Sequence, residues 1–155
     1  MTVEIREADL GAPDDAEAVV ALLDEYARHP LGQSQALSGD VRARLIPGLR
    51  RHPGAFVLLA CKGADRIGVA VCFRGFSTFA GLPLINIHDL AVTAAHRRKG
   101  VGRALLEDIL RRARESGCAK VTLEVRDDNT AARRLYKRMG FGPWSVPMLF
   151  VSRWL

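Results

Sequence analysis

The sequence predicts a single mixed α/β domain that spans residues 1–155. Its 155 residues match the usual size of one domain, and 48% hydrophobic with 26% charged residues is an ordinary composition for a globular protein. Strand-like and helix-like runs follow in the order strand, two helices, three strands, helix, strand, helix and terminal strands. This order, without an internal repeat, indicates one mixed sheet covered by helices.

The first half of the chain is predicted to contain a strand, two helices and a β-hairpin. Val3–Arg6 alternates between apolar and charged residues, as a half-buried strand does. Apolar residues at helical spacing cover about residues 14–28, and Ser38-Gly39-Asp40 starts a shorter helix that runs to Arg51. The β-rich runs 55–61 and 66–73 are separated by the turn signal Lys62-Gly63-Ala64-Asp65, which predicts two antiparallel strands.

The second half is predicted to place a buried strand ahead of two further helices. Residues 84–92 are nearly all apolar, as expected of a central strand buried on both faces, so the polar residues inside it need another explanation. A helix from Val101 ends at Ser116-Gly117, and a strand over 120–125 follows. Asn129 is a suitable N-cap for a helix that stops at Gly140, and Phe141–Leu155 suggests two last strands or a hairpin.

Composition and motif spacing exclude several classes of protein. The longest stretches without a charged residue have 14 residues, fewer than the roughly 18 that a membrane span needs. The N-terminus is charged from Glu4 and has no apolar run for a signal peptide, so we expect a cytoplasmic protein. The 3 cysteines and 4 histidines show no metal-ligand spacing, so we expect neither a disulfide framework nor a bound metal.

A basic loop with two glycines joins the buried strand to the next helix. It reads His96-Arg97-Arg98-Lys99-Gly100-Val101-Gly102. Unpaired N–H groups and the helix dipole, roughly +0.5 charge, favour an anion at such a helix start, and the glycines allow close approach. The loop fits neither G-x-G-x-x-G nor G-x-x-x-x-G-K-[ST], because Leu105 stands where the third glycine of the dinucleotide motif would be. It therefore predicts a phosphate ligand other than NAD or ATP, with a basic helix start that binds nothing as the alternative.

Three segments form a longer pattern. They are His88-Asp89-Leu90-Ala91-Val92, then Arg97-x-x-Gly100-x-Gly102, then Asn129 followed by Leu135-Tyr136-Lys137-Arg138-Met139-Gly140-Phe141. In this order and spacing they resemble the GNAT superfamily of acetyl-CoA-dependent N-acetyltransferases, and the order of elements agrees over nearly the whole chain. The resemblance implies a mostly antiparallel mixed sheet, splayed between two parallel strands at 84–92 and 120–125, with helices on both faces.

The resemblance also implies acetyl-CoA as co-substrate and no metal. Pantetheine would lie in the splay against the backbone of Leu90, Ala91 and Val92, where an amide would polarise the thioester carbonyl. The loop would hold the pyrophosphate through Arg98, Lys99, Gly100, Val101 and Gly102, with Arg97 as the leading residue of the motif. Asn129 matches a residue that contacts the cofactor in the family, and simple N-capping is an open alternative for it.

For catalysis, a base is useful because an alkyl amine with a pKa of about 10.4 is neutral only about once in 2,500 molecules at pH 7. His88 is the first choice, since an ordinary histidine pKa of about 6.5 suits proton transfer, and Asp89 is the second. In a regular strand the two side chains point to opposite faces, so only one faces the acceptor unless a bulge intervenes. Asn86 stands where some relatives carry a carboxylate, and it cannot accept a proton. A buried histidine bonded to the backbone is the structural alternative for His88.

Tyr136 stands where the family places the acid that protonates the departing thiolate, and packing against Ala132 is its structural alternative. The implied reaction is direct attack of a primary amine on the thioester in a ternary complex, with a small molecule, peptide or protein as acceptor. Candidate substrate-binding residues are Tyr26, Phe73, Phe76 and Phe79, although phenylalanines there are more often core. No acidic cluster indicates a polyamine or an aminoglycoside.

Two other functions stay open. A catalytically weak relative would only sense acetyl-CoA. The net charge of +6, with 19 arginines among 23 basic residues, would also suit a nucleic-acid-binding module. Its contacts would be Arg111, Arg112, Arg114, Arg133, Arg134 and Arg138, for which solvated helix faces are the more ordinary role. The apolar segment 146–155, which contains Trp154 and follows Trp144, either completes a core or covers a homodimer interface.

Overall fold

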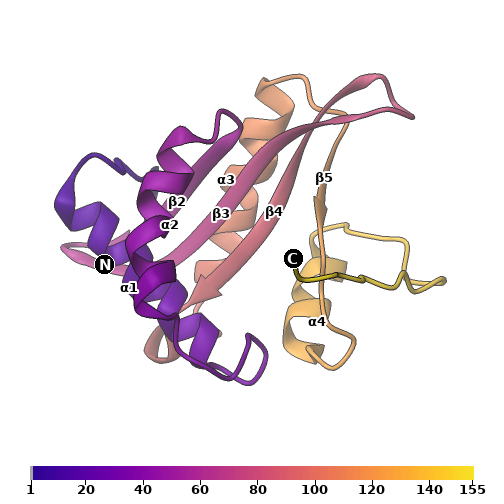
Figure 1. Ribbon diagram of the computed structural model, residues 1–155. Helices are drawn as coiled ribbons and strands as arrows, with labels where there is room; N and C mark the ends of the chain where they lie inside the picture. The colour runs from indigo at the N-terminus through magenta and orange to yellow at the C-terminus, as the bar shows by residue number, and fades with distance from the viewer. Residues whose placement is uncertain (1) are drawn as a thin grey trace. The chain divides into compact units, whose positions relative to one another are not determined.

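The computed structural model describes residues 2–155, which form two compact units (Figure 1). The first unit ends at Leu123 and contains one sheet with three helices, and the second comprises Glu124–Leu155. The elements of the first unit are β1 (Glu4–Glu7), α1 (Pro13–Arg28), α2 (Gly39–Arg51), β2 (Ala55–Lys62), β3 (Asp65–Ser77), β4 (Leu82–Val92), a 3-10 turn (Ala94–His96), α3 (Val101–Glu115) and β5 (Lys120–Leu123). The second unit contains α4 (Thr130–Arg138).

The sheet is mixed and mostly antiparallel. Its five strands lie in the order β1-β2-β3-β4-β5, with antiparallel pairing from β1 to β4. The pairing of β4 with β5 is parallel and covers only Leu84–Ile87 against Lys120–Leu123. Because β5 ends there, β4 continues to Val92 with β3 as its only neighbouring strand. This opening confirms the predicted fold class and the predicted splay, although β5 is two residues shorter than the expected run of 120–125.

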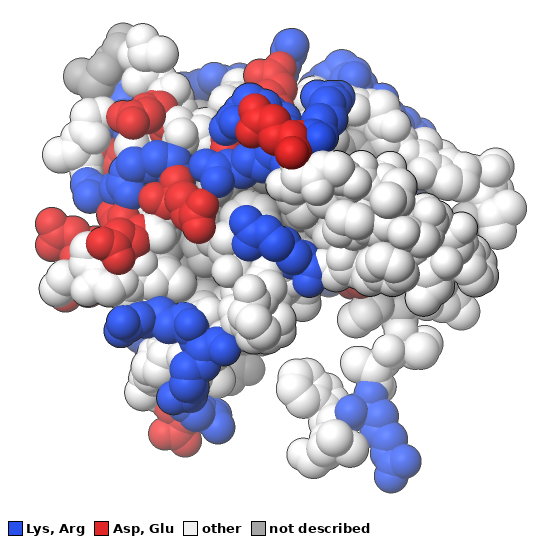
Figure 2. Space-filling view, turned by 90° about the horizontal axis from the view of Figure 1, so that it is seen from above, with Lys and Arg blue, Asp and Glu red and all other residues white. Residues whose placement is uncertain are grey.

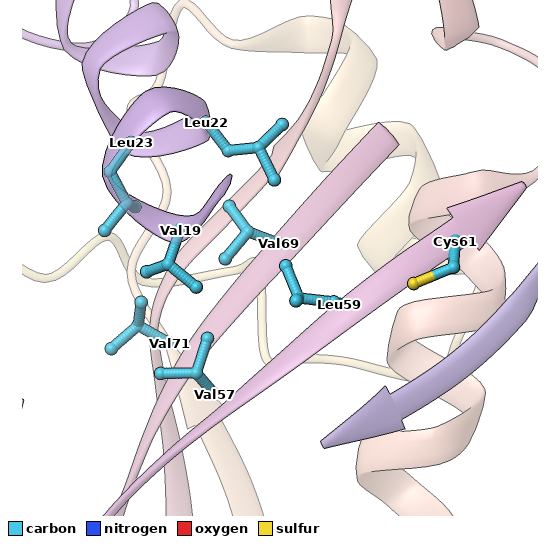
Figure 3. Close-up of a cluster of buried hydrophobic side chains, with 8 residues drawn as sticks. All are labelled: Val19, Leu22, Leu23, Val57, Leu59, Cys61, Val69 and Val71. Atoms are coloured by element: carbon cyan, nitrogen blue, oxygen red, sulfur yellow. The ribbon is translucent and has the colours of Figure 1, made fainter. Parts of the chain in front are cut away.

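Helices cover both faces of the sheet, α1 and α2 in front and α3 behind in Figure 1. Figure 3 shows the core under α1, where Val19, Leu22 and Leu23 pack against side chains of β2 and β3. Burying one such side chain stabilises the fold by roughly 1.5–3 kcal/mol. On the opposite face Leu105, Leu106 and Ile109 of α3 are fully buried. The sheet is therefore held from both sides, as the continuous apolar runs of β2 and β3 require.

Two buried carboxylates fix the helices of the first unit. Asp15 accepts hydrogen bonds from the Arg6 guanidinium at 2.6 and 2.7 Å and from the Asp9 backbone N–H at 2.9 Å, which ties β1 to α1. Asp24 accepts from the Leu37 backbone N–H at 2.8 Å and pairs with Arg42 of α2 at 3.2 Å. These bonds hold the connection between α1 and α2, and so they set where α2 lies on the sheet.

The two last strands expected over Phe141–Leu155 are absent from the structure, and that prediction is wrong. Residues 124–155 contain no strand. Pro143 and Pro147 remove two backbone donors that a regular ladder would use. Apolar side chains of the segment are exposed instead, with Met148 at 91% and Trp154 at 95%. The segment therefore completes no core within the part of the chain that the structure describes.

Candidate functional site

The polar residues inside β4 are explained by a β-bulge. Val71 of β3 pairs with Asp89, but its neighbour Cys72 pairs with Ile87, so His88 is an extra residue in β4. A bulge re-aims side chains that would otherwise alternate between the two faces. Asp89 shares the face of its partner Val71, which is the face covered by α1 and α2. The bulge turns His88 toward the same side, and this is the exception that the sequence left open.

Both side chains line one cavity of about 450 Å³ between α2 and the sheet. Most of the wall is apolar and comes from Leu23 of α1, from β3 and from one side of α2. The lining residues are Leu23, Val41, Arg44, Leu45, Gly48, Leu49, His52, Val71, Phe73, His88 and Asp89. A cavity of this size suits a small molecule or one side chain of a larger one. The cavity is therefore the candidate acceptor site.

The two candidate bases differ in their surroundings. His88 is exposed, and its ring makes an edge contact with Phe73 at 5.5 Å between centroids. Asp89 is half-buried, and burial raises the pKa of its carboxyl, while the nearby His88 lowers that pKa by a smaller amount. A carboxylate with a raised pKa is a stronger proton acceptor than an ordinary aspartate. The alternative of a buried, backbone-bonded histidine is wrong for His88, since its side chain is exposed.

The wall that α2 contributes was not predicted from the sequence. His52, at the end of α2, accepts a hydrogen bond from the Gly54 N–H on Nδ1 at 3.2 Å and makes an edge contact with Phe73 at 4.9 Å between ring centroids. Phe73 therefore contacts two imidazoles, those of His52 and His88. Arg44, Gly48 and His52 follow at intervals of four, so they form one row along the helix. In the sequence, only this polar row and the neighbouring apolar row of Val41, Leu45 and Leu49 could have indicated that α2 forms a wall of the cavity.

The end of β4 presents free backbone groups toward its open edge. The Thr93 N–H donates to the Ile67 carbonyl at 3.0 Å, and bonding alternates along an antiparallel pair, so Ala91 bonds with β3. Leu90 and Val92 consequently direct their N–H and C=O groups away from β3. The Val92 carbonyl accepts a hydrogen bond from Arg97 Nε at 3.1 Å. Leu90 thus offers both its groups to an added extended chain, and Val92 offers its N–H.

The basic loop ends in a helix start without a side-chain cap. Gly100 is the N-cap of α3, adopts a left-handed φ of 84° and has no side chain to bond the first turn. The N–H groups of that first turn have no helical acceptor, so they remain available to an anion. Arg98 also has a positive φ of 60°, an unusual conformation for a residue with a side chain. Lys99, Val101 and Gly102 complete the loop and the first turn, as predicted.

Several residues considered in the sequence analysis lie outside the cavity. Asn86 faces β5 and donates to Thr122 Oγ1 at 3.0 Å, so it braces the parallel pair. Tyr26 lines a small recess beside Val92 and Arg97 rather than the cavity. Phe76 is 62% exposed and Phe79 is fully exposed on the β3–β4 hairpin. Of the predicted acceptor contacts, the structure brings Phe73 into the cavity with His88 and Asp89.

The second unit contains the two remaining predicted residues. Tyr136 is nearly buried in α4, and its ring makes an edge contact with Phe141 at 5.8 Å between centroids. Asn129 caps α4, since its Oδ1 accepts from the Ala132 N–H at 3.2 Å. The capping role of Asn129 is confirmed, and the cofactor role of Asn129 and the acid role of Tyr136 stay predictions.

Ion pairs occupy many of the arginines considered for nucleic-acid binding. Arg112 binds Asp108 at 2.7 Å and Glu7 at 2.9 Å, Arg111 binds Glu115 at 2.9 Å, and Arg133 binds Asp127 at 2.6 Å. On the face shown in Figure 2, acidic and uncharged side chains interrupt the basic ones, so no continuous basic stripe forms there. Solvated, paired helix faces therefore account for Arg111, Arg112 and Arg133.

Cysteine and metal chemistry have little support in this site. Cys61 and Cys72 are buried, and burial raises the pKa of the Cys72 thiol to about 12. No cysteine lines the cavity. Within residues 2–155, no group of three or more His, Cys, Asp or Glu side chains is placed to hold a metal. In the same residues, no helix has the length and apolarity to span a bilayer.

The mixed sheet that opens after Ile87, followed by a basic loop and a glycine-capped helix, defines the class as an α/β acetyltransferase fold. The sequence matches the Acetyltransferase (GNAT) family over residues 16–141. The chain belongs to this family.

Relatives with assigned names agree with this family. The uncharacterized N-acetyltransferase YhfO of Bacillus subtilis is 30% identical over 127 residues, which is 82% of this chain and 83% of that protein. A mycothiol acetyltransferase of Thermobispora bispora is 32% identical over 142 residues, 88% of this chain but 46% of that protein. The chain thus spans less than half of that relative.

Solved structures agree in fold. A ribosomal-protein-alanine N-acetyltransferase of Brucella melitensis biovar Abortus superposes with a TM-score of 0.76 at 22% identity, over 99% of this chain and all of that one. A structure described as a transcriptional regulator from Bacillus halodurans reaches 0.82 at 24% identity, over 98% of this chain and all of that one. At these identities the likeness concerns the fold alone.

Proposed function

We propose that this protein transfers the acetyl group of acetyl-CoA to a primary amine by direct attack in a ternary complex. The observation that carries the proposal is the bulge at His88, which puts two proton acceptors on the wall of one cavity. The same strand continues into the open edge at Leu90 and Val92 and then into the basic loop. Proton acceptors, a thioester-binding edge and an anion site thus follow one another along about fifteen residues of chain, from His88 to Gly102.

The residues present fit acetyl-CoA. Leu90 and Val92 can pair with the extended pantetheine as a strand would, because their free groups point away from β3. The open first turn of α3 suits the pyrophosphate, and Arg97, Arg98 and Lys99 add positive charge near its anionic end. Gly100 leaves this helix start uncovered. An added Cβ at Gly100 would meet no atom within 4 Å, so the space beside the helix start is open.

In the reaction, the amine nitrogen bonds to the thioester carbon, the C–S bond breaks, and coenzyme A leaves as the thiol. The amine must lose a proton, which His88 accepts, and the Asp89 carboxylate beside it stabilises the positive imidazole. A backbone N–H at the open edge donates to the carbonyl oxygen as negative charge develops there. Tyr136 is proposed as the acid that returns a proton to the leaving sulfur. The absence of a cysteine from the cavity lining supports direct attack over an acetyl-cysteine intermediate.

The family match crosses from the first unit into the second, which supports one acetyltransferase domain over residues 1–155. A cytoplasmic location stays a prediction from the sequence. Acetyl-CoA titration by calorimetry, combined with a thiol-release assay on an amine panel, tests the function. Binding with amine-dependent release supports the enzyme. Binding without release across the panel would favour a sensor, and no binding would refute the proposal.

A further inference from the structure

The space beneath α2 is kept open by the composition of that helix. No residue of α2 is fully buried, although Leu45 and Leu49 face the sheet and pack partly against the core. Gly48 lies in the lining itself, and an added Cβ there would meet no atom within 4 Å. Glycine inside a helix costs about 1 kcal/mol relative to alanine, so this position gives up stability while the cavity stays free.

The walls of the cavity favour a ligand with an apolar group. Apolar side chains from three elements, namely Leu23, Leu49 and Phe73 with their neighbours, supply most of the lining. An apolar group that fills such a cavity gains the transfer free energy of the area it removes from water. A polyamine or an aminoglycoside would lose hydration there without acidic partners, because Asp89 is the only acidic residue of the lining.

The positive charge of Arg44 in the lining favours a ligand that also has a carboxylate. Arg44 is a lining residue on α2, across from Asp89 on β4. Its Nε donates to the Asp40 carbonyl of the same helix at 3.1 Å, and no carboxylate of residues 2–155 lies within ion-pair distance of its guanidinium. Arg42, by contrast, is already paired with Asp24. The terminal nitrogens of Arg44 can therefore receive a carboxylate from the acceptor.

We infer that the acceptor is an amino acid with a hydrophobic side chain. The apolar body lies beneath α2 in the space at Gly48, the carboxylate binds Arg44, and the amine faces His88 and Asp89. This inference rests on the proposed function for its chemistry, but it makes a separate claim about binding. Arg44 also acts against acceptors with a second positive charge, since like charges repel.

The test compares L-phenylalanine, 2-phenylethylamine and spermidine as acceptors. The first two share the apolar body and differ in the carboxylate, and the third has charge without an apolar body. Wild-type protein should use L-phenylalanine with the highest kcat/KM. Arg44→Gln should lower kcat/KM for L-phenylalanine about tenfold, the value of one exposed charge-assisted bond, and leave 2-phenylethylamine within about twofold. Arg51→Gln is the matched control, because Arg51 is on the same helix and outside the lining.

Gly48→Leu tests the space itself. The new side chain has room to enter the cavity, so the variant should fold and keep its affinity for acetyl-CoA while kcat/KM for L-phenylalanine falls about 100-fold. Gly39→Leu is its control, since Gly39 also has free space, begins α2 and lies outside the lining. Unchanged use of L-phenylalanine by Gly48→Leu, or a preference of the wild type for spermidine, would overturn the inference.

A binding measurement separates this inference from the proposed function. If no amine releases thiol, calorimetric titration with L-phenylalanine still tests the cavity. Binding that weakens in both Arg44→Gln and Gly48→Leu would uphold the pocket while the enzymatic proposal fails. Release with other amines, without binding or use of L-phenylalanine, would overturn the inference and leave the proposed function standing.

Discussion

Removing the paired proton acceptors should change the pH dependence of the reaction as well as its rate. His88 and Asp89 face one cavity because of the bulge, so each can partly replace the other. A general base contributes about 10²–10⁴-fold to such reactions. We therefore expect His88→Ala or Asp89→Asn to lower kcat at pH 7 by about 10–100-fold, and the double variant by about 10³-fold.

The free energy at stake can be worked out from the amine. An alkyl amine with a pKa of about 10.4 lies 3.4 pH units above neutrality, which corresponds to about 4.6 kcal/mol for removal of its proton. With a base in place, protonated amine reacts from the complex, so kcat/KM should form a plateau between the pKa of the base and that of the amine. Without a base only neutral amine reacts. For the double variant kcat/KM should then rise about tenfold per pH unit up to the amine pKa.

The assay is thiol release from pH 6 to 10 with 2-phenylethylamine, whose apolar body fits the cavity and which has no second titrating group. Acetyl-CoA affinity serves as the control, because neither side chain belongs to the open edge or the loop. The reasoning is refuted if the double variant keeps the wild-type plateau, since proton removal would then not depend on either residue.

Three further predictions concern other parts of the molecule. Gly100→Ala should weaken acetyl-CoA binding about tenfold in calorimetry, because the left-handed N-cap becomes strained by about 1 kcal/mol or more. Gly117→Ala is the control, since Gly117 has a similar φ of 70° beyond the other end of α3, and this variant should leave the affinity for acetyl-CoA unchanged. Tyr136→Phe should lower kcat more than it changes the Kd of acetyl-CoA, and an unchanged kcat would exclude Tyr136 as the acid. Asp15→Asn should lower the free energy of unfolding by about 2 kcal/mol and Tm by about 4–8 °C at pH 7, because Arg6 loses its buried partner. The bond to Arg6 holds the pKa of Asp15 below its ordinary value of 3.8. The wild type should therefore exceed Asp15→Asn in free energy of unfolding by the full amount above about pH 4, and by less as the pH falls further. A difference in unfolding free energy that does not change with pH would contradict this.

Most of the fold could be predicted because the spacing of apolar residues and the positions of turn residues indicate the same helices and strands along the first unit. The mostly apolar run of residues 84–92 indicated the central strand, and Ser38 and Asn129 marked helix starts that the structure caps as expected. The segment after Phe141 could not be predicted in this way. Its apolar residues suggest strands locally, but strand formation depends on a neighbouring edge, and two prolines weaken the pairing.

One part of the candidate site could be predicted from the sequence, and the other part could not. The glycine loop is local in sequence, so its helix-start geometry at Gly100 could be predicted. The candidate acceptor site is a cavity built from α1, α2, β3 and β4, so its lining depends on tertiary packing. His52 and Arg44 were missed for this reason, because neither a histidine after a helix nor an arginine within it carries a signal of what lies opposite. The register shift at His88 depends on the pairing with β3, which the strand sequence alone does not determine.

The most direct test of the proposed function is thiol release from acetyl-CoA by wild-type protein with 2-phenylethylamine and L-phenylalanine, beside calorimetric titration of acetyl-CoA alone. The structure predicts saturable binding of acetyl-CoA and release that depends on the amine. Absence of acetyl-CoA binding would refute the proposal, because the open edge of β4 would then hold no pantetheine and the uncapped start of α3 no pyrophosphate.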